Sequence, residues 1–184
     1  MLLILLAGMP GSGKSIVAKA ASEAGLPVVN MGDVVREETL RRYGEITPAL
    51  MLKTSIELRA EYGEDYIAVK TIERIPRNAK IVVVDGVRSL AEVEAFRRLG
   101  KPVILAVHAS PKTRFERLLK RSRPGDPKSL DEFNKRDEIE LKLGVGSVIA
   151  LADYVIVNET SVEEVLKEAK RIIEKVVSNA EDNC

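Results

Sequence analysis

The stretch that decides the fold is GMPGSGKS, residues Gly8–Ser15, which satisfies the pattern GxxxxGK[ST]. An apolar run precedes it and a helical pattern follows it, which is the context that this phosphate-binding motif requires. Glycines at Gly8, Gly11 and Gly13 let successive N–H groups turn toward a phosphate, and the following helix adds the positive end of its dipole. The stretch therefore predicts an anion-binding loop between a strand and a helix.

The last two residues of this stretch have expected roles. Lys14 is expected to reach the β- and γ-phosphates of ATP, and the Ser15 hydroxyl is expected to ligate Mg²⁺. The alternative is a glycine-rich turn without a ligand. That alternative requires the pattern GxxxxGK[ST] to occur by chance, which happens in roughly 1% of chains of this length. The residues predicted to bind the nucleotide are Gly8, Met9, Pro10, Gly11, Ser12, Gly13, Lys14 and Ser15.

The apolar run MLLILLAG could be taken for a signal peptide, but it lacks a basic start and a cleavage site of small residues. It is also far shorter than the ~20 residues of a membrane span. A buried parallel strand is covered on both faces and shows such an unbroken run. Similar segments follow at Leu26–Asn30, Lys80–Asp85, Pro102–His108 and Asp153–Asn158. These segments alternate with helices, which predicts an α/β P-loop fold with a five-stranded parallel sheet and helices on both faces.

Composition narrows the class of protein. The chain has 184 residues, 45% hydrophobic and 31% charged, which fits one globular domain. A formal net charge of +1 gives no indication of nucleic-acid or membrane binding. Cys184 is the single cysteine and cannot form a disulfide framework or a cysteine-rich metal site. A reducing, cytoplasmic setting is therefore expected.

Helix start signals divide the chain further. Thr47 with Pro48, and Ser110 with Pro111, read as an N-cap followed by the first turn. Capping-box spacing and a glycine stop mark other helix ends, namely Ser89 with Glu92, Ser129 with Glu132, Ser161 with Glu164, and Gly25. We expect a single domain over residues 1–178, with a helical acceptor-binding insertion at about 31–76 and a helical lid at about 120–145. Residues 179–184 are expected to form a flexible tail.

Two further segments place charged residues beyond strand ends. In NMGDVVRE, residues 30–37, Gly32 and Asp33 are expected to turn the chain, and Arg36 falls in the next helix. In VVVDGVRS, residues 82–89, Asp85 ends a buried strand and Arg88 follows it. Open α/β sheets bind ligands at the carboxyl edge of their strands. Two arginines there can hold a second phosphate.

Several of these residues have a structural alternative. Asp33 is either a catalytic group or only the N-cap of a helix that begins at Val34. Arg36 is either a phosphate ligand or a solvated residue paired with a nearby acid. Glu92 is either an acceptor contact or only the capping-box partner of Ser89. His108 ends a strand without a partner motif, so we expect a structural histidine there.

Nine basic residues lie between Lys112 and Arg136. Helical spacing places Phe115, Leu118 and Leu119 on one face and Arg114, Arg117 and Arg121 on another. The basic face is either solvated surface or part of a lid whose arginines close over the phosphates. The turn RPGDP, residues 123–127, would be the hinge or tip of that lid.

In their order along the chain, GxPGSGK, GDxxR, DGxxR, an arginine-rich segment and ADYVIVN resemble the landmarks of nucleoside monophosphate kinases, adenylate kinase in particular. The chain is most similar to an archaeal adenylate-kinase-related P-loop family, over residues 1–177. The resemblance implies a sheet with the P-loop strand in the middle, ATP and Mg²⁺ as ligands, and a nucleoside monophosphate, AMP first, as acceptor. It implies that Asp85 holds Mg²⁺ through water and that Arg117 contacts the nucleotide. It also implies an acceptor site formed by Gly32, Arg36, Arg88 and Glu92, and catalytic roles for Lys14, Arg88, Arg121 and Arg136.

The chain departs from adenylate kinases at three positions. Asn30 and Met31 replace the usual Ser-Thr, and Glu92 replaces a glutamine. The segments LPVVNMGDVV and ADYVIVNETS also resemble dephospho-coenzyme A kinases, in which an aspartate at the Asp33 position accepts the proton of a ribose hydroxyl. Two alternatives to a monophosphate kinase therefore stay open: a dephospho-coenzyme A or other small-molecule kinase, and a nucleotide-dependent regulatory or assembly ATPase.

Overall fold

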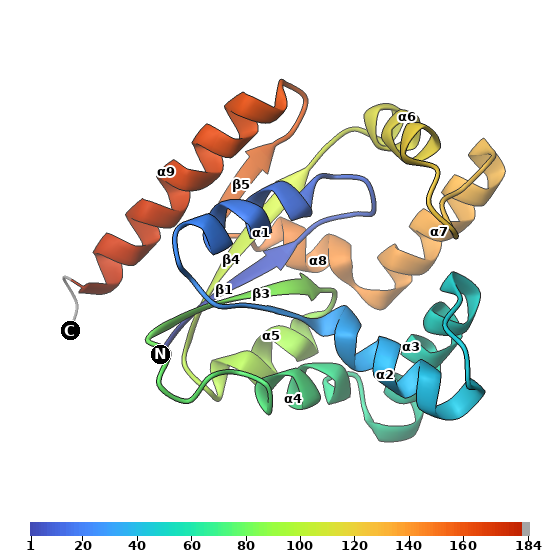
Figure 1. The fold of residues 1–184 in the computed structure, drawn as a ribbon, viewed down its shortest axis with the longest axis horizontal. Helices are drawn as coiled ribbons and strands as arrows, with labels where there is room; N and C mark the ends of the chain where they lie inside the picture. Colours follow the sequence, from blue (N-terminus) through green and yellow to red (C-terminus); the bar gives the residue numbers. More distant parts are fainter. Residues whose placement is uncertain (182–184) are drawn as a thin grey trace.

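A computed structural model of the chain describes residues 1–181 and forms a five-stranded, all-parallel sheet in the order β2-β3-β1-β4-β5 (Figure 1). The strand that carries the P-loop, β1, lies in the middle, as expected. The strands are β1 (Leu2–Ala7), β2 (Val28–Asn30), β3 (Ile81–Val87), β4 (Lys101–His108) and β5 (Tyr154–Val157). The five segments predicted from the sequence are therefore confirmed as strands.

Helices cover both faces of this sheet (Figure 1). Within the described residues they are α1 (Lys14–Glu23), α2 (Met31–Tyr43), α3 (Pro48–Tyr62), α4 (Tyr66–Ile72), α5 (Leu90–Arg97), α6 (Pro111–Arg121), α7 (Leu130–Leu143), α8 (Val145–Ala150) and α9 (Val162–Glu181). The two predicted helical insertions are present, with α2 to α4 between β2 and β3, and α7 and α8 between α6 and β5. No helix in residues 1–181 combines the length and apolarity that a membrane crossing requires.

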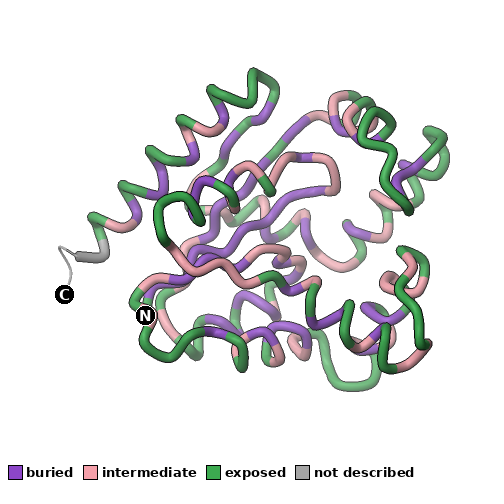
Figure 2. The backbone as a smooth tube through the Cα atoms, in the orientation of Figure 1, coloured by how far each residue is buried: buried purple, intermediate pink, exposed green. Residues whose placement is uncertain are grey.

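The buried run of β1 is apolar throughout because both of its faces are covered. Residues 2, 4 and 6 pack in the core formed with α1 and α9. Residues 3, 5 and 7 pack in the opposite core, which includes side chains from α2, α4, α5 and α8. In Figure 2 the buried residues, drawn in purple, follow the strands through the middle of the molecule. An alternating polar pattern would therefore place charge in one of the two cores.

Helix starts follow the capping signals in most cases. Thr47, Ser89, Ser110 and Ser129 are N-caps whose side chains accept a hydrogen bond from a backbone N–H group of the first turn. The stop signal at Gly25 is also confirmed, since its φ is 77° directly beyond the end of α1.

Two boundaries differ from the prediction. Helix α2 begins at Met31 and not at Val34, because the side chain of Asn30 accepts the Gly32 N–H at 2.7 Å and caps the helix three residues earlier. Helix α9 continues to Glu181, through part of the expected tail, because its apolar stripe keeps packing on the sheet as far as Val176. The remaining predicted tail, including Cys184, lies outside the described residues.

The carboxyl ends of the strands bring the motifs together on one edge of the sheet. The P-loop follows β1, Asn30 ends β2, Asp85 lies near the end of β3, and Asn158 follows β5. The pairing of β1 with β3 shifts between Leu6 and Ala7, so that β3 continues two residues beyond Asp85. This edge is the candidate functional site.

Candidate functional site

The glycines shape the loop between β1 and α1. Gly8, Gly11 and Gly13 have φ values of 154°, 82° and 97°, which L-residues rarely adopt. A Cβ at Gly8 would lie 2.4 Å from the carbonyl oxygen of Val107, and a Cβ at Gly13 would lie 2.1 Å from Nδ2 of Asn158. The loop can therefore keep this shape only with glycine at these two positions.

Lys14 begins α1 and folds back over the loop. Its ammonium donates a hydrogen bond to the carbonyl oxygen of Gly8 at 2.6 Å. Burial lowers the pKa of Lys14 below its ordinary value, and the nearby Asp85 carboxylate opposes this shift. Weaker electrostatic interactions reach Arg88 and Glu140. The P-loop cation therefore lies within electrostatic range of charges on the opposite side of the site.

Asp85 has the features of a metal-binding carboxylate. Its Oδ1 is buried without a hydrogen-bond partner, and its Oδ2 accepts a long hydrogen bond of 3.4 Å from Asn30. Burial raises the pKa of Asp85, while Lys14 and Arg88 oppose that shift. No group of three or more His, Cys, Asp or Glu side chains in residues 1–181 could hold a metal by itself. Mg²⁺ commonly takes only one or two protein oxygen ligands beside water and phosphates, so Asp85 and the Ser15 hydroxyl fit that ion.

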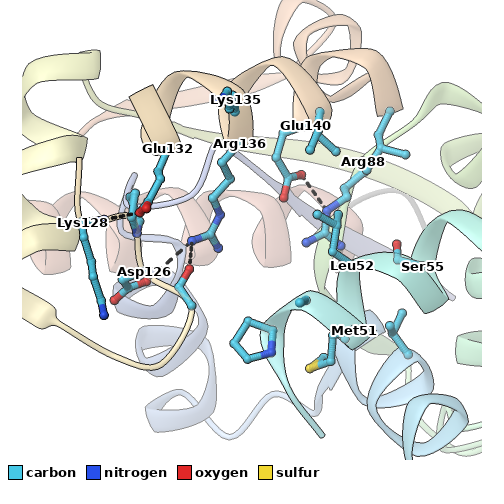
Figure 3. Close-up of a pocket in the computed structure, with 18 residues that line it drawn as sticks. Met51, Leu52, Ser55, Arg88, Asp126, Lys128, Glu132, Lys135, Arg136 and Glu140 are labelled. Carbon is cyan, nitrogen blue, oxygen red and sulfur yellow. Dashed lines mark hydrogen bonds and ion pairs between the residues drawn. The ribbon is translucent and has the colours of Figure 1, made fainter. Parts of the chain in front are cut away.

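A cleft of about 690 Å³ opens between two groups of helices (Figure 3). Helices α2 and α3 on one side belong to the predicted acceptor-binding insertion, and α7 on the other side, called the lid-side helix, belongs to the predicted lid. Apolar side chains from both sides line it, among them Val35, Met51, Leu52, Ile139 and Leu143. Charged side chains also face it, including Arg88, Lys128, Lys135, Arg136 and Glu140. Asp126 and Glu132 line it as well, so the cleft combines an apolar wall with side chains of both charge signs, in the usual size range of small-molecule sites.

Arg88 is the central cation of this cleft. Its Nε donates a hydrogen bond of 2.8 Å to the Glu140 carboxylate on α7 (Figure 3). Burial disfavours the charge on Arg88, but the neighbouring Glu140 outweighs it and raises the pKa of Arg88. Burial likewise disfavours the Glu140 carboxylate, yet Arg88 lowers the pKa of Glu140 overall. The pair thus joins the end of β3 to the lid-side helix.

Three arginines were expected on the lid side, Arg117, Arg121 and Arg136, and the last two meet at Asp126. Arg121 at the end of α6 donates from Nε to Asp126 at 2.8 Å, and the bond from Arg121 is the main reason that the pKa of Asp126 is lowered. Arg136 on α7 donates to the carbonyl of Gly125 at 3.2 Å and lines the cleft. A Cβ at Gly125 would lie 2.1 Å from Cβ of Pro48, so this loop lies against the start of α3. The lid-side segment and the acceptor-side helices are therefore in contact.

Arg117 contacts the P-loop through Asn158. Its Nη2 donates to Oδ1 of Asn158 at 3.0 Å, and Nδ2 of Asn158 donates to the Ser12 carbonyl at 2.8 Å. Nη1 of Arg117 and the Ser12 hydroxyl are buried without hydrogen-bond partners. These atoms leave donor capacity beside the loop, which suits an anionic ligand.

The prediction of two separate faces on α6 is wrong in part. Arg114 is only 3% exposed and forms a two-pronged ion pair with Asp137 on α7. Leu119, placed with the apolar face, is 42% exposed. The reason is that α7 packs on the Arg114 side of α6 and supplies both a carboxylate and the ring of Phe133. Arg114 is thus an interior residue and not part of a solvated stripe.

The acceptor-side residues divide into two groups. Gly32 and Arg88 line the cleft, as expected for acceptor contacts. Arg36 is exposed on α2, with Nε 3.9 Å from Asp33, and is not among the cleft-lining residues. Asp33 lies in the first turn of α2 and is not its N-cap, since Asn30 has that role. The proposed cap function of Asp33 is therefore wrong, and Arg36 forms the local ion pair that was its structural alternative.

Glu92 is fully buried and its two carboxylate oxygens are both engaged. Oε1 accepts from Arg59 on α3 at 2.5 Å, and Oε2 accepts the Arg88 N–H at 2.7 Å. The capping box with Ser89 is present. The expected acceptor contact is therefore corrected: Glu92 caps α5 and anchors α3, and it does not line the cleft.

Three residues of the site were not among the predicted ones. Glu140 lies four residues beyond Arg136, a spacing that shares one helix face and could have revealed it. Asn158 follows the last strand, as Asp85 follows the buried part of β3, so the same reasoning could have selected it. Asp137 gave no local signal, because its partner Arg114 lies in another helix. His108, expected to be structural, is exposed at the end of β4.

Sequence comparisons establish the family. A family model described as an AAA domain matches residues 7–134. A UPF0200 protein from Staphylothermus marinus is 60% identical over 184 residues, covering 100% of this chain and 97% of that protein. This chain belongs to the UPF0200 family. A second UPF0200 protein, from Methanocaldococcus jannaschii, is 47% identical over 98% of this chain and 93% of its own length. The expected membership of an archaeal P-loop family is thereby confirmed.

Solved structures share the fold of this UPF0200 chain. A Thermus thermophilus protein aligns with a TM-score of 0.64 and 21% identity, covering 95% of this chain and 97% of that protein. The shikimate kinase of Acinetobacter baumannii, solved in complex with shikimate, aligns with a TM-score of 0.60 and 17% identity, over 97% and 93% of the two chains. At these identities the similarity concerns the fold alone. The UPF0200 chain therefore has a P-loop kinase fold with a five-stranded parallel sheet.

Proposed function

We propose that this protein is an ATP-dependent phosphotransferase that moves the γ-phosphoryl group to a small acceptor bound in the cleft. The observation that carries the proposal is the closeness of the P-loop cation to the cleft. The loop follows β1, and Arg88 follows the neighbouring strand β3 and lines the cleft. The charges of Arg88, Arg136 and Glu140 on the cleft wall also influence the pKa of Lys14. A phosphoryl group on the loop and an acceptor in the cleft would then share one set of positive charges.

The nucleotide would be held by the loop, and Arg117 would contact it from α6. Ser15 and Asp85 would hold Mg²⁺, which neutralises charge on the phosphate oxygens when it is bound. Lys14 would leave the Gly8 carbonyl to bind the β- and γ-phosphates. The unpartnered buried atoms Oδ1 of Asp85 and Nη1 of Arg117 support these assignments.

The proposed acceptor is a nucleoside monophosphate, with AMP first. Its base would pack on the apolar wall near Val35 and Leu52, and its phosphate would bind Arg88. Phosphoryl transfer requires little covalent help, so Arg88, Arg121 and Arg136 would act by aligning the reactants and neutralising charge. Arg36 would need to leave Asp33 and turn toward the cleft to take part.

The second candidate is a kinase for a hydroxyl-bearing acceptor, such as dephospho-coenzyme A or another small molecule. Asp33 supports it, because this exposed carboxylate follows Gly32, which lines the cleft. A hydroxyl must lose its proton as it attacks, and Asp33 would accept that proton. An acceptor phosphate is already ionised and would not need this residue.

A panel of acceptors separates these candidates. The wild-type protein is incubated with ATP and Mg²⁺ together with AMP, GMP, CMP, UMP or dephospho-coenzyme A, and ADP formation and the phosphorylated product are both measured. We expect product with AMP and none with Lys14→Ala. Product only with dephospho-coenzyme A would favour the second candidate. ATP hydrolysis that no acceptor stimulates would refute both and favour a regulatory or assembly ATPase.

Thermal shifts in the same panel report binding apart from turnover. A ligand at 100 times its dissociation constant adds about 2.7 kcal/mol to the free energy of unfolding. Each acceptor is tested with and without a non-hydrolysable ATP analogue, and we expect the largest shift with AMP.

A further inference from the structure

We propose that Arg114 is a positioning residue that links the phosphate-binding loop to α7, so that nucleotide on the loop sets the position of the cleft residues Arg136 and Glu140. The inference rests on the proposed function only in requiring that the loop binds a nucleotide. It concerns neither the nucleotide contacts nor the acceptor contacts themselves, and Arg114 lines no part of the cleft.

One guanidinium nitrogen joins the two elements. Nη1 of Arg114 donates to the carbonyl oxygen of Pro10, within the loop, at 3.2 Å. The same nitrogen donates to Oδ1 of Asp137, on α7, at 2.8 Å. Nη2 donates to the other oxygen of Asp137. The loop and the lid-side helix therefore share a single, planar hydrogen-bonding group.

The rest of the side chain is held from two further directions. Nε donates to the carbonyl of Ala109, just beyond β4, at 3.2 Å, and the guanidinium carbon lies 4.9 Å from the ring centre of Phe133 on α7. With only 3% of Arg114 exposed, solvent cannot replace these partners. The group therefore has one position, fixed by the loop, the strand end and α7 together.

The backbone of Arg114 also touches the loop. A Cβ at Gly11 would lie 3.0 Å from the carbonyl oxygen of Arg114 and 3.2 Å from its Cβ. Pro10, which accepts from the Arg114 guanidinium, and Gly11, which lies against the Arg114 backbone, are neighbours within the loop. A change in the loop is thus transmitted directly to α6 and to the guanidinium.

Helix geometry carries the effect to the cleft. Asp137 directly follows Arg136 and precedes Glu140 by three residues on the same helix. Each residue adds about 1.5 Å along a helix axis, so Asp137 and Glu140 lie about 4.5 Å apart along it. A displacement at Asp137 therefore moves both cleft residues, including the carboxylate that holds Arg88.

The chemistry requires an arginine at this position. Lysine has no fork of donors and cannot bond both oxygens of Asp137 while it also reaches Pro10. If the residue only stabilised the core, an apolar group of similar volume would serve as well, since buried ion pairs are often no more stabilising than packed apolar side chains. A coupling role and a purely structural role thus make different predictions.

Hydrogen exchange of α7 tests the coupling. In the wild type we expect ADP with Mg²⁺ to slow exchange in the loop and in residues 130–143. In Arg114→Lys and Asp137→Asn we expect the loop to respond while the change in α7 falls to less than about one-third of the wild-type change. Arg171→Lys is the matched control, because this arginine pairs with Glu168 on the surface of α9, and it should respond like the wild type.

Two outcomes would overturn the inference. One is an unchanged α7 response in both variants, and the other is a wild-type α7 that does not respond although its loop does. Should Arg114→Lys fail to fold, Asp137→Asn decides alone, since it keeps the shape of the side chain. The experiment uses ADP without any acceptor, so absence of phosphoryl transfer would refute the proposed function and leave this result intact. A wild-type loop that does not respond to ADP would refute both.

Discussion

Replacing Glu140 with glutamine removes the charge from the Arg88 pair and preserves its shape. The bond from Nε of Arg88 to Glu140 measures 2.8 Å, with side-chain exposures of 31% and 10%. A hydrogen bond to a charged group contributes about 1.5–3 kcal/mol, and a neutral one about 0.5–1.5 kcal/mol. Because Arg88 is nearly one-third exposed, solvent screening favours the lower end of the difference. Glu140→Gln should therefore lower the free energy of unfolding by about 1 kcal/mol at pH 7.

The pH dependence follows from the pKa of Glu140, which the fold lowers from its ordinary value of 4.5. A carboxyl with a lowered pKa stabilises the folded state above its unfolded-state pKa, and this contribution is lost as the pH falls through the folded-state value. The difference between wild type and Glu140→Gln should thus be complete at pH 7 and should be lost as the pH falls below 4.5 and through the lowered folded-state pKa of Glu140. In a chain of this length, 1 kcal/mol corresponds to about 2–4 °C in Tm.

Thermal and urea unfolding at pH 7 and over a series of acid pH values measure this difference. Glu168→Gln is the control, because Glu168 and Arg171 form an exposed pair whose charges are screened by solvent. The reasoning is refuted if Glu140→Gln and Glu168→Gln have equal effects at pH 7. It is also refuted if the difference between wild type and Glu140→Gln persists at low pH, because charge could not then be its cause.

Three further substitutions test the remaining assignments. Lys14→Ala should abolish phosphoryl transfer and leave Tm within about 2 °C, because the side chain packs on loop carbonyls and not in the core; a product assay with circular dichroism checks both, and wild-type turnover would contradict it. Asp33→Asn should lower single-turnover transfer to AMP by less than about tenfold, whereas a loss of about 10² to 10⁴-fold would identify a general base; Asp85→Asn, expected to fail with any acceptor, is the reference. Glu92→Gln should lower the free energy of unfolding by about 3–5 kcal/mol, since it leaves Arg59 buried without its carboxylate; a changed acceptor ranking at unchanged stability would return Glu92 to the acceptor site.

Local patterns predicted the fold and the loop well. The strand β1 is apolar on both faces because it lies in the middle of the sheet, and a sequence shows that directly. The phosphate-binding loop is likewise a contiguous segment whose glycines have positive φ. Caps such as Thr47 and Ser89 act within four residues. Features that depend only on residues close together in the chain could therefore be predicted from the sequence.

Residues with distant partners could not be assigned in this way. The Glu92 carboxylate forms an ion pair with Arg59, which is 33 residues away in the chain. Arg114 forms an ion pair with Asp137, which is 23 residues away. In both cases the partner converts an expected surface or ligand group into an interior one. At the start of α2 the prediction failed although the residues involved are close in the chain. Asn30 and Asp33 are both good N-caps, and only the end of strand β2 selects Asn30.

The bond from Asn158 to the Ser12 carbonyl joins residues that are 146 positions apart in the chain. The ribosome adds about 5–20 residues per second, so roughly 7–30 s separate the synthesis of Ser12 from that of Asn158. During that interval the nascent chain already carries every glycine of the loop but lacks the side chain that holds it in shape. The loop therefore gains this hydrogen bond only after the last strand has been made, late in the growth of the chain on the ribosome.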